Sequence, residues 1–427
     1  MTTDKIIVIG AGLAGLYSAF LLQELGYDVV VLEARNRVGG RTYTEDGVDL
    51  GGQWVSSLHS RVMKLCEKFD LKIYRQFEDG AMIRYFNQKR EELSNFTEHN
   101  KRHDSFAPYI ERFYQLTEGD DFFSKHQDLD QISFYDWCKK NVSDEMALNT
   151  FNYSFNLSTC VDPNFASMFF WLYFLKSCGG FYALAGIKDS AQEFRIEGGI
   201  QMLSNALSAK LKLIYNTEVT HVEKKSGLYQ IRTKDQRVYC ANKVISALPA
   251  QLIPKIVWNP SLVKERIDFY KSLKMGSVTK VVIQYEIAFW REDGYNALII
   301  SDVPPVRLCY DACNNKYNAV VIFIVDDCGY TDKEILDHLA FLLNNDLAKN
   351  PKKIYRKNWS QDPFSGGCYF CVPPVNSLAK HHQYLMAPHD EIYFVGTETA
   401  SEWMGYIEGA LESAERLLTQ ISIKTIL

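Results

Sequence analysis

Residues 5–33 read KIIVIGAGLAGLYSAFLLQELGYDVVVLE. The apolar run 5–9 predicts a strand, a glycine turn follows, and the apolar-periodic run from Leu13 to Leu25 predicts a helix. A second apolar run then ends in Glu33, so the stretch forms one complete βαβ unit. The chain is therefore expected to open with a Rossmann-like α/β domain, built on a parallel sheet, that binds a dinucleotide.

The glycine turn has the spacing of the dinucleotide fingerprint. Gly10, Gly12 and Gly15 allow, in that order, a tight turn, close approach of the backbone to a pyrophosphate, and close packing of the helix on the strand. The start of the helix attracts phosphates through its unpaired N–H groups and positive dipole end. Glu33 is placed to accept hydrogen bonds from a ribose diol and disfavours a 2′-phosphate, so FAD or NAD is favoured over NADP. The contacts predicted in this unit are Gly10, Gly12, Leu13, Ala14, Gly15, Glu33 and Ala34.

Two glycine pairs that follow separate FAD from NAD. They lie in residues 37–42, RVGGRT, and in residues 49–54, DLGGQW. Glycine pairs let the backbone reach a flat ring or a phosphate, and a nearby arginine can neutralise a pyrophosphate. Together with the fingerprint they predict FAD. The expected contacts here are Arg35, Gly40, Arg41, Thr42, Gly52, Gln53 and Trp54.

The bulk properties are those of an ordinary globular protein. A chain of 427 residues exceeds what one hydrophobic core supports, so two domains are expected. A net charge of -5 gives no global basic field, which argues against nucleic acid as a partner. Ten cysteines without a signal peptide indicate reduced thiols and a cytoplasmic location. No apolar run is long enough to predict a membrane helix, and the longest, residues 166–175, predicts a buried helix.

The composition changes three times along the chain. Residues 77–194 are aromatic-rich and helical in character, a meander of short strands is expected from 210 to 249, and apolar strands with a helix follow residue 270. Thr331 and Glu334 have capping-box spacing, and a last helix is expected from Gly405 to Leu418. The pattern predicts two interleaved domains. The FAD-binding domain comprises residues 1–78, 195–269 and 362–427, and an α+β substrate-binding domain comprises residues 79–194 and 270–361.

Motifs along the full length resemble the flavin amine oxidases, and those of the last third resemble the monoamine oxidase type. They are GAGLAGL, EARNRVGGRT, DLGGQW, the glycine pair at 198–199, VISALP, GSVTK, KNW, SGGCY and FVGTETASEWMGYIEGALESAER. The resemblance implies the fold of the glutathione-reductase and amine-oxidase type. It also implies FAD-dependent oxidative deamination of a primary or secondary monoamine to an aldehyde through an imine, with O2 as electron acceptor and H2O2 as product.

By the same resemblance, Tyr369 and Tyr406 flank the substrate nitrogen in front of the flavin ring, and Lys280 reaches the reactive ring nitrogen through a water. Two aromatic faces form a low-dielectric slot that attracts an amine yet favours its neutral form. Lys280 lies in an otherwise apolar strand, where an unpaired ammonium is costly to bury. These three are the predicted catalytic residues.

Cys368 corresponds to the cysteine that forms a thioether to the flavin in the animal monoamine oxidases. A covalent bond through Cys368 and a buried thiol beside non-covalent FAD are both open. Cys368 and Cys371 form a CxxC, but no second pair with zinc-ligand spacing exists, so no metal is expected. Other contacts implied by the resemblance are Val219, Trp359, Gly396, Thr397, Glu398, Gly405, Tyr406 and Ile407.

The resemblance places Ala185 and Leu308 in the substrate pocket, with Tyr369 and Tyr406, where family members carry larger residues. The pocket is then wider than that of an aryl-ethylamine oxidase. A polyamine or diamine oxidase stays open, because an acid such as Asp311 could bind a second ammonium. An L-amino-acid oxidase would need a buried arginine, for which Arg307 is the candidate, and a non-catalytic flavoprotein is a further alternative. We expect no C-terminal membrane helix, and a homodimer is left open.

Overall fold

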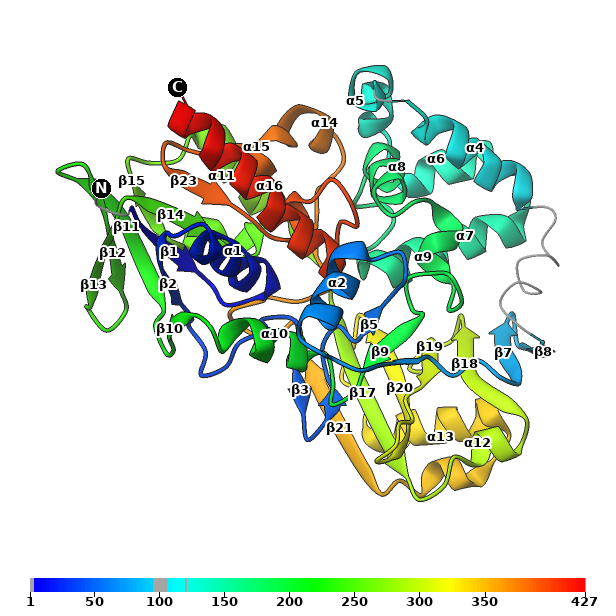
Figure 1. Cartoon of the computed structure of the whole chain (residues 1–427). Coiled ribbons are helices and arrows are strands. Elements are labelled where there is room, and N and C mark those ends of the chain that lie inside the picture. Colours follow the sequence, from blue (N-terminus) through cyan, green and yellow to red (C-terminus); the bar gives the residue numbers. More distant parts are fainter. Residues whose placement is uncertain (1–3, 95–105, 120, 427) are drawn as a thin grey trace.

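The computed structural model describes residues 4–94, 106–119 and 121–426. Its first sheet is parallel, with five strands in the order β10-β2-β1-β14-β23 (Figure 1). β1 (Lys5–Ile9) pairs with β2 (Asp28–Leu32) on one side and with β14 (Lys243–Ser246) on the other. β10 (Lys212–Ile214) and β23 (Ile392–Phe394) form the edges. The predicted α/β class with a parallel dinucleotide-binding sheet is confirmed, and its strands come from three separate parts of the chain.

Helix α1 (Leu13–Glu24) is covered on several sides. It packs beside α16 (Ile407–Ile426), seen as the red helix next to the dark blue one in Figure 1, and against α10 (Gln201–Ser208). Nine of its 12 residues are buried, which explains why the helix is apolar all round. The helix predicted from Gly405 to Leu418 is α16, which begins two residues later and continues to Ile426.

The meander is shorter than predicted. β11 (Val219–Lys225), β12 (Leu228–Thr233) and β13 (Val238–Ala241) are antiparallel, and β15 (Val257–Asn259) pairs parallel to β11. The first and last runs of the expected meander supply β10 and β14 of the parallel sheet instead. Local alternation predicts a strand but not its partner, and the partner decides the sheet.

The second large sheet has seven strands in the order β21-β17-β20-β19-β18-β7-β8. Helix α13 (Asp332–Leu343) packs against this sheet, and its predicted capping box between Thr331 and Glu334 is confirmed. The strands are β7 (Ala81–Phe86), β8 (Lys89–Leu93), β17 (Val278–Tyr285), β18 (Tyr295–Ser301), β19 (Leu308–Asp311), β20 (Asn318–Val325) and β21 (Lys353–Asn358).

Strands β7 and β8 correct the prediction that residues 77–194 are helical. They form a hairpin at the edge of the seven-stranded sheet. Its two turn residues, Asn87 and Gln88, both have positive φ, of 50° and 62°. This is the backbone of a tight two-residue hairpin turn. Gln88 is not among the residues that usually mark such a turn, so the sequence did not predict the hairpin.

A layer of helices lies above the seven-stranded sheet in the view of Figure 1. Nine of the ten residues of α8 (Met168–Ser177) are buried, in agreement with the buried helix predicted there. In the described ranges, no helix combines the length and apolar character needed to cross a membrane. The other helices of the layer are α4 (Ala107–Thr117), α5 (Phe122–Lys125), α6 (Phe134–Asn141), α7 (Glu145–Thr159) and α9 (Phe181–Ala185).

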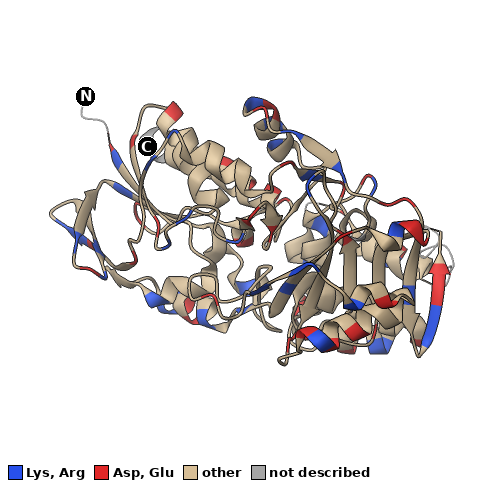
Figure 2. Cartoon of the chain, turned by 90° about the horizontal axis from the view of Figure 1, so that it is seen from below, with Lys and Arg blue, Asp and Glu red and all other residues tan. Residues whose placement is uncertain are grey.

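Acidic and basic residues are interspersed along outer loops and helices in Figure 2, while the central strands carry few of either. This view agrees with the modest net charge of -5. The remaining elements are β3 (Thr44–Glu45), β4 (Val48–Asp49), β5 (Trp54–Val55), α2 (Ser60–Lys68), β6 (Ile73–Arg75), η1 (Gln127–Gln131), β9 (Phe194–Ile196), η2 (Ala250–Lys255), α11 (Lys264–Ser272), β16 (Lys274–Met275), α12 (Phe289–Glu292), η3 (Asp346–Lys349), β22 (Cys371–Val372), α14 (Leu378–His381), α15 (Gln383–Met386) and η4 (Thr397–Thr399).

Candidate active site and cofactor cavity

A cavity of about 640 Å³ is bounded by the parallel sheet, the seven-stranded sheet and the helical layer. The glycine turn after β1 and the end of β2 line it on one side. Strands β17 to β20 and helix α7 line it on the other. A crevice at the carboxyl ends of parallel strands is where such sheets bind their ligands. The cavity is therefore the candidate site.

The glycine turn leaves room for a phosphate. A Cβ atom built on Gly12 meets nothing within 4 Å, so the space beside this residue is open to the cavity. A Cβ on Gly15 would instead overlap the carbonyl oxygen of Gly10, so Gly15 serves the close packing of helix on strand. No side chain of the described residues caps the N-terminus of α1, and its first turn holds no acid. The N–H groups there are free to bind an anion.

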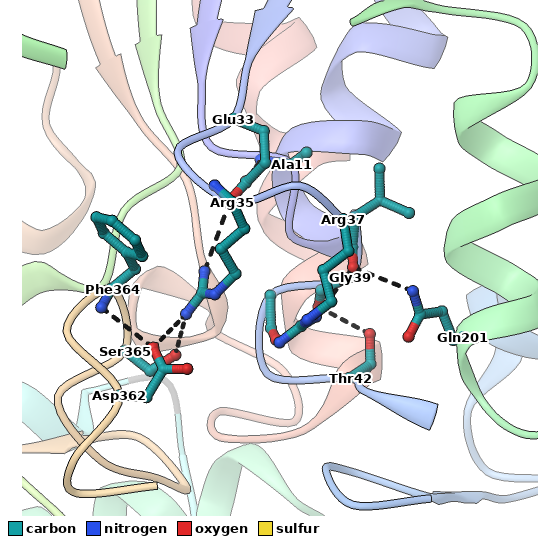
Figure 3. Close-up of polar contacts among 12 residues, drawn as sticks. Ala11, Glu33, Arg35, Arg37, Gly39, Thr42, Gln201, Asp362, Phe364 and Ser365 are labelled. Carbon is teal, nitrogen blue, oxygen red and sulfur yellow. Dashed lines mark hydrogen bonds and ion pairs between the residues drawn. The ribbon is translucent and has the colours of Figure 1, made fainter. Parts of the chain in front are cut away.

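Glu33 is fixed at the end of β2, as Figure 3 shows. It is 3% exposed, and its two carboxylate oxygens accept the backbone N–H groups of Ala11 and Arg35 at 2.7 and 2.9 Å. These bonds use one acceptor position on each oxygen, and further positions remain for a ribose diol. The Arg35 guanidinium lies 3.7 Å from the Glu33 carboxylate and also donates to Asp362 and Ser365 at 2.5 and 2.9 Å. Its charge is thus already balanced by a carboxylate of the protein.

Arg41 connects the early glycine motif to the end of the chain. Its guanidinium pairs with Glu398 at 2.5 and 3.1 Å and donates to the carbonyl oxygen of Tyr369 at 2.8 Å. The Thr42 hydroxyl closes the glycine turn by donating to the Gly39 carbonyl at 2.8 Å (Figure 3). The motif of residues 37–42 therefore holds one of the predicted catalytic tyrosines in place.

Lys280 lies on β17 and is 2% exposed. Its ammonium donates to the carbonyl of Gly51 at 2.8 Å and to the side-chain oxygen of Gln53 at 2.5 Å. Burial lowers the pKa of Lys280 to about 7, although Asp49 acts in the opposite direction. The third of its three donors has no acceptor among the described residues, and Lys280 lines the cavity, so it can exchange a proton there near neutral pH.

Tyr369 and Tyr406 both line the cavity, and burial raises the pKa of each phenol well above its usual range. Tyr406 packs edge-on against Trp403 at 5.2 Å, and His59 lies 5.9 Å behind it. Burial lowers the pKa of His59 to about 3, so this imidazole stays neutral. The Cys160 thiol lies next to the Tyr369 phenol and contributes to the raised pKa of that phenol. Two neutral aromatic faces thus border the same space.

Cys368 and Trp359 also line the cavity. Burial raises the pKa of the Cys368 thiol to about 12, and the nearby cations Arg41 and Lys280 act against this rise. The Trp359 indole donates to the Leu50 carbonyl at 2.8 Å. Because its only N–H is used there, Trp359 offers the cavity an apolar face.

The structure brings most of the predicted site residues to this cavity, including Val219, Leu308, Gly396 and Thr397. Gly15 and Glu398 are not among the lining residues, and Ala185 ends α9 with a side chain outside the described ones. Other residues that line the cavity were not predicted from the sequence, both on the cofactor side and on the side formed by the seven-stranded sheet and the helical layer. The former include Leu32, Gly39, Gly51, Thr217, Ala247, Leu248, Pro249 and Ala410, and the latter Phe86, Thr150, Tyr153, Ser154, Leu157, Ser158, Phe181, Leu184, Gln192, Ile300, Tyr310 and Phe323.

These residues fit FAD. The space at Gly12 matches the place that the fingerprint assigns to a pyrophosphate. In addition, the side-chain nitrogen of Gln53 is buried and has no hydrogen-bond partner among the described residues. An unpaired buried donor is rare, and a heterocycle with acceptor atoms would satisfy it. The residues predicted to hold the phosphates, the ribose and the ring are thus arranged along one cavity.

Two charged residues kept open by the sequence lie elsewhere. Asp311 is 1% exposed and pairs with the Arg291 guanidinium at 2.7 and 2.8 Å, so it is not available to a second ammonium. Arg307 lines a separate cavity of about 390 Å³, where it donates to Asn156 at 2.8 Å and lies over the Tyr153 ring at 4.8 Å. Neither residue lines the main cavity.

Comparisons with known proteins give the same picture as the geometry. A family model described as flavin containing amine oxidoreductase matches residues 13–417. The chain is 30% identical over 450 residues to a probable flavin-containing monoamine oxidase A of Dictyostelium discoideum, covering 100% of this chain and 99% of the relative. It is also 30% identical over 450 residues to the flavin-containing amine oxidase B of Homo sapiens, covering 97% of this chain and 85% of that protein. Among solved structures, a triple mutant of putrescine oxidase with redesigned cofactor binding has a TM-score of 0.92 at 25% identity, over 99% of both chains.

Proposed function

Because the chain belongs to the family of flavin-containing amine oxidoreductases, we propose that it is an oxidase of primary or secondary monoamines. Membership makes it an enzyme that oxidises amines with FAD and O2. Bound FAD would supply the two-electron oxidation of the amine at its α carbon and the transfer of those electrons to O2, with H2O2 as the product. Water converts the released imine to an aldehyde.

We favour monoamines because of where the carboxylates of the cavity wall lie. Of the described residues that line the cavity, two are carboxylates, Glu33 and Glu218. Both lie at the glycine-turn end, since Thr217, next to Glu218, donates its backbone N–H to the Glu33 carbonyl at 2.8 Å. The part near Tyr369 and Tyr406 therefore offers a second ammonium no counter-ion among the described residues. Burying an unpaired ammonium is costly, so diamines bind poorly there.

The chain's own residues have distinct tasks in this proposal. Tyr369 and Tyr406 border a low-dielectric space that favours the neutral amine, the form whose lone pair assists loss of the α hydrogen. Lys280, hydrogen-bonded to Gly51 and Gln53, holds a proton close to neutral pH and can supply positive charge while O2 is reduced. Cys368 lines the cavity, which supports a thioether to the flavin as a further part of the proposal.

A diamine oxidase is the second candidate, because the putrescine oxidase triple mutant has a very similar fold. The test is anaerobic mixing of the purified flavoprotein with benzylamine, phenethylamine, putrescine and spermidine, following loss of the oxidised flavin band. We expect the two aryl amines to reduce the flavin at concentrations at least about tenfold lower than putrescine or spermidine do, because the latter must bury at least one further unpaired charge. Reduction by diamines alone would instead establish the second candidate.

A pair of variants at Leu308 sharpens this test. Leu308 starts β19 and lines the cavity. Leu308→Glu places a carboxylate there and should shift the preference toward putrescine, whereas Leu308→Gln is the uncharged control of nearly equal size and should not. If both variants respond alike, the missing counter-ion is not what excludes diamines.

Three other points are proposed rather than established. The domains are residues 1–78, 195–269 and 362–427 for FAD and 79–194 and 270–361 for the substrate, supported by the division of strands between the two large sheets. A cytosolic location is supported by the ten cysteines, all of which have free thiols. A homodimer is a further prediction from the sequence.

A further inference from the structure

Helix α7 turns a row of hydroxyl groups toward the cavity. Thr150, Ser154 and Ser158 all line it. Their spacing of four residues puts them on one face of the helix, about 6 Å apart from one to the next along its axis. The row therefore extends over about 12 Å.

These hydroxyls are free to bind a ligand. In the part of the chain that the structure describes, no hydrogen bond joins any of the three to a protein group. Serine and threonine in a helix commonly bond back to a carbonyl of the preceding turn, as Thr159 of the same helix does with Phe155 at 2.9 Å. Thr150, Ser154 and Ser158 do not; Thr150 is 9% exposed, and Ser154 and Ser158 are half-buried in the cavity wall. A polar group placed this way needs a partner from the cavity.

The row has a defined direction. At its C-terminal end, α7 reaches Cys160, whose thiol lies next to the Tyr369 phenol, so Ser158 is the member of the row nearest Tyr369 along the helix. Along the helix axis, Ser154 and Thr150 lie about 6 and 12 Å farther from this end than Ser158 does.

Apart from the Tyr310 phenol, the side chains that strands β18 to β20 contribute to the cavity are apolar. Ile300, Leu308 and Phe323 line the cavity from neighbouring strands of the seven-stranded sheet. An entirely apolar tail would match this wall but leave the α7 hydroxyls without partners and without water. A tail with a hydroxyl on one side of an apolar body satisfies both walls.

We propose that the α7 hydroxyl row selects monoamines whose far end carries a hydroxyl group, with Ser154 as the principal contact. The inference rests on the proposed monoamine oxidase function and specifies its substrate class. A hydroxyl of the substrate exchanges hydrogen bonds with Ser154 and with a neighbour in the row. The carbon body lies against Leu308 and Phe323, and the amine lies between the tyrosines.

The test compares amines that differ by one hydroxyl, tyramine against phenethylamine and 5-aminopentan-1-ol against pentylamine. Anaerobic stopped-flow mixing gives the rate of flavin reduction at a series of amine concentrations; the concentration dependence gives the apparent dissociation constant, and the limiting rate gives flavin reduction itself. We expect the hydroxylated member of each pair to bind about 3- to 10-fold more tightly, the effect of one net hydrogen bond. In Ser154→Ala this ratio should fall toward one, and in Ser154→Thr it should be retained.

Leu157→Ala is the control for a change of shape. Leu157 lines the cavity from the same helix without a hydroxyl, so its truncation should weaken both members of a pair and leave their ratio unchanged. Thr150→Val and Ser158→Ala then locate the contact along the row. A wild-type ratio of one, or a ratio that survives all three hydroxyl deletions, overturns the selection by α7 while flavin reduction by the amines still supports the proposed function. Absence of both binding and reduction with every amine overturns the proposed function as well.

Discussion

Replacing Lys280 by Met removes the titratable ammonium group that lines the cavity near the predicted flavin ring. The pKa of about 7 means that the ammonium is about 90% charged at pH 6 and about 10% charged at pH 8. If the charged form assists electron transfer to O2, the rate constant of flavin reoxidation in the wild type falls about tenfold between these values. In Lys280→Met the rate should be low and nearly independent of pH. The sign follows from the lowered pKa, since charge is present below pH 7 and lost above it.

The assay is stopped-flow mixing of anaerobically reduced protein with oxygenated buffers from pH 6 to 9. Flavin reduction by benzylamine, measured in parallel, should change less than reoxidation does. Lys357→Met is the matched control, because Lys357 is the cross-strand neighbour of Lys280, lies 5.1 Å over the Trp359 ring and does not line the cavity. Equal reoxidation rates in the wild type and Lys280→Met, or a wild-type rate that does not vary with pH, would refute the assignment.

Three further predictions test other parts of the site. Cys368→Ala should release FAD on acid precipitation, whereas the wild type should retain the yellow chromophore in the pellet; release from both would exclude the thioether. Gly12→Ala should keep the folded apoprotein but weaken FAD binding, while Gly15→Ala should lower stability by about 1–3 kcal/mol through overpacking against Gly10, as thermal unfolding and flavin titration can separate. Glu398→Ala should cost about 3 kcal/mol in urea unfolding because the Arg41 charge loses its partner, and an unchanged midpoint would contradict this.

The cofactor side of the cavity could be predicted from the sequence because its requirements are local. Gly10, Gly12 and Glu33 lie within one βαβ unit, where the turn, the phosphate space and the ribose acceptor are fixed by spacing. Two residues predicted to contact the cofactor do not line the cavity, because each packs against or pairs with another part of the protein. Gly15 packs on Gly10 instead of facing the cavity, and Glu398 reaches the site only by pairing with Arg41.

The substrate side could not be predicted because it depends on packing between distant segments. The sequence suggested that the Asp311 carboxylate could bind a second ammonium of the substrate. In the structure, that carboxylate instead pairs with Arg291, 20 residues earlier. The hairpin of β7 and β8 and the direction of the hydroxyl face of α7 are set by tertiary contacts. In sequence, Ser154 and Ser158 are indistinguishable from the solvent-facing serines of an amphipathic helix.

This difference explains how one scaffold can serve several amines. The cofactor side is built largely from backbone in short motifs, so few substitutions are tolerated at positions such as Gly10 and Gly15. The substrate side is built from side chains on separate elements, and each needs only to be apolar or small. Leu308 or Ser154 can therefore change without disturbing the glycine turn. Relatives named for monoamines and a structure named for putrescine can thus share nearly the full length of this chain at 25–30% identity, and we propose that side chains of α7 and β19 decide which amine binds here.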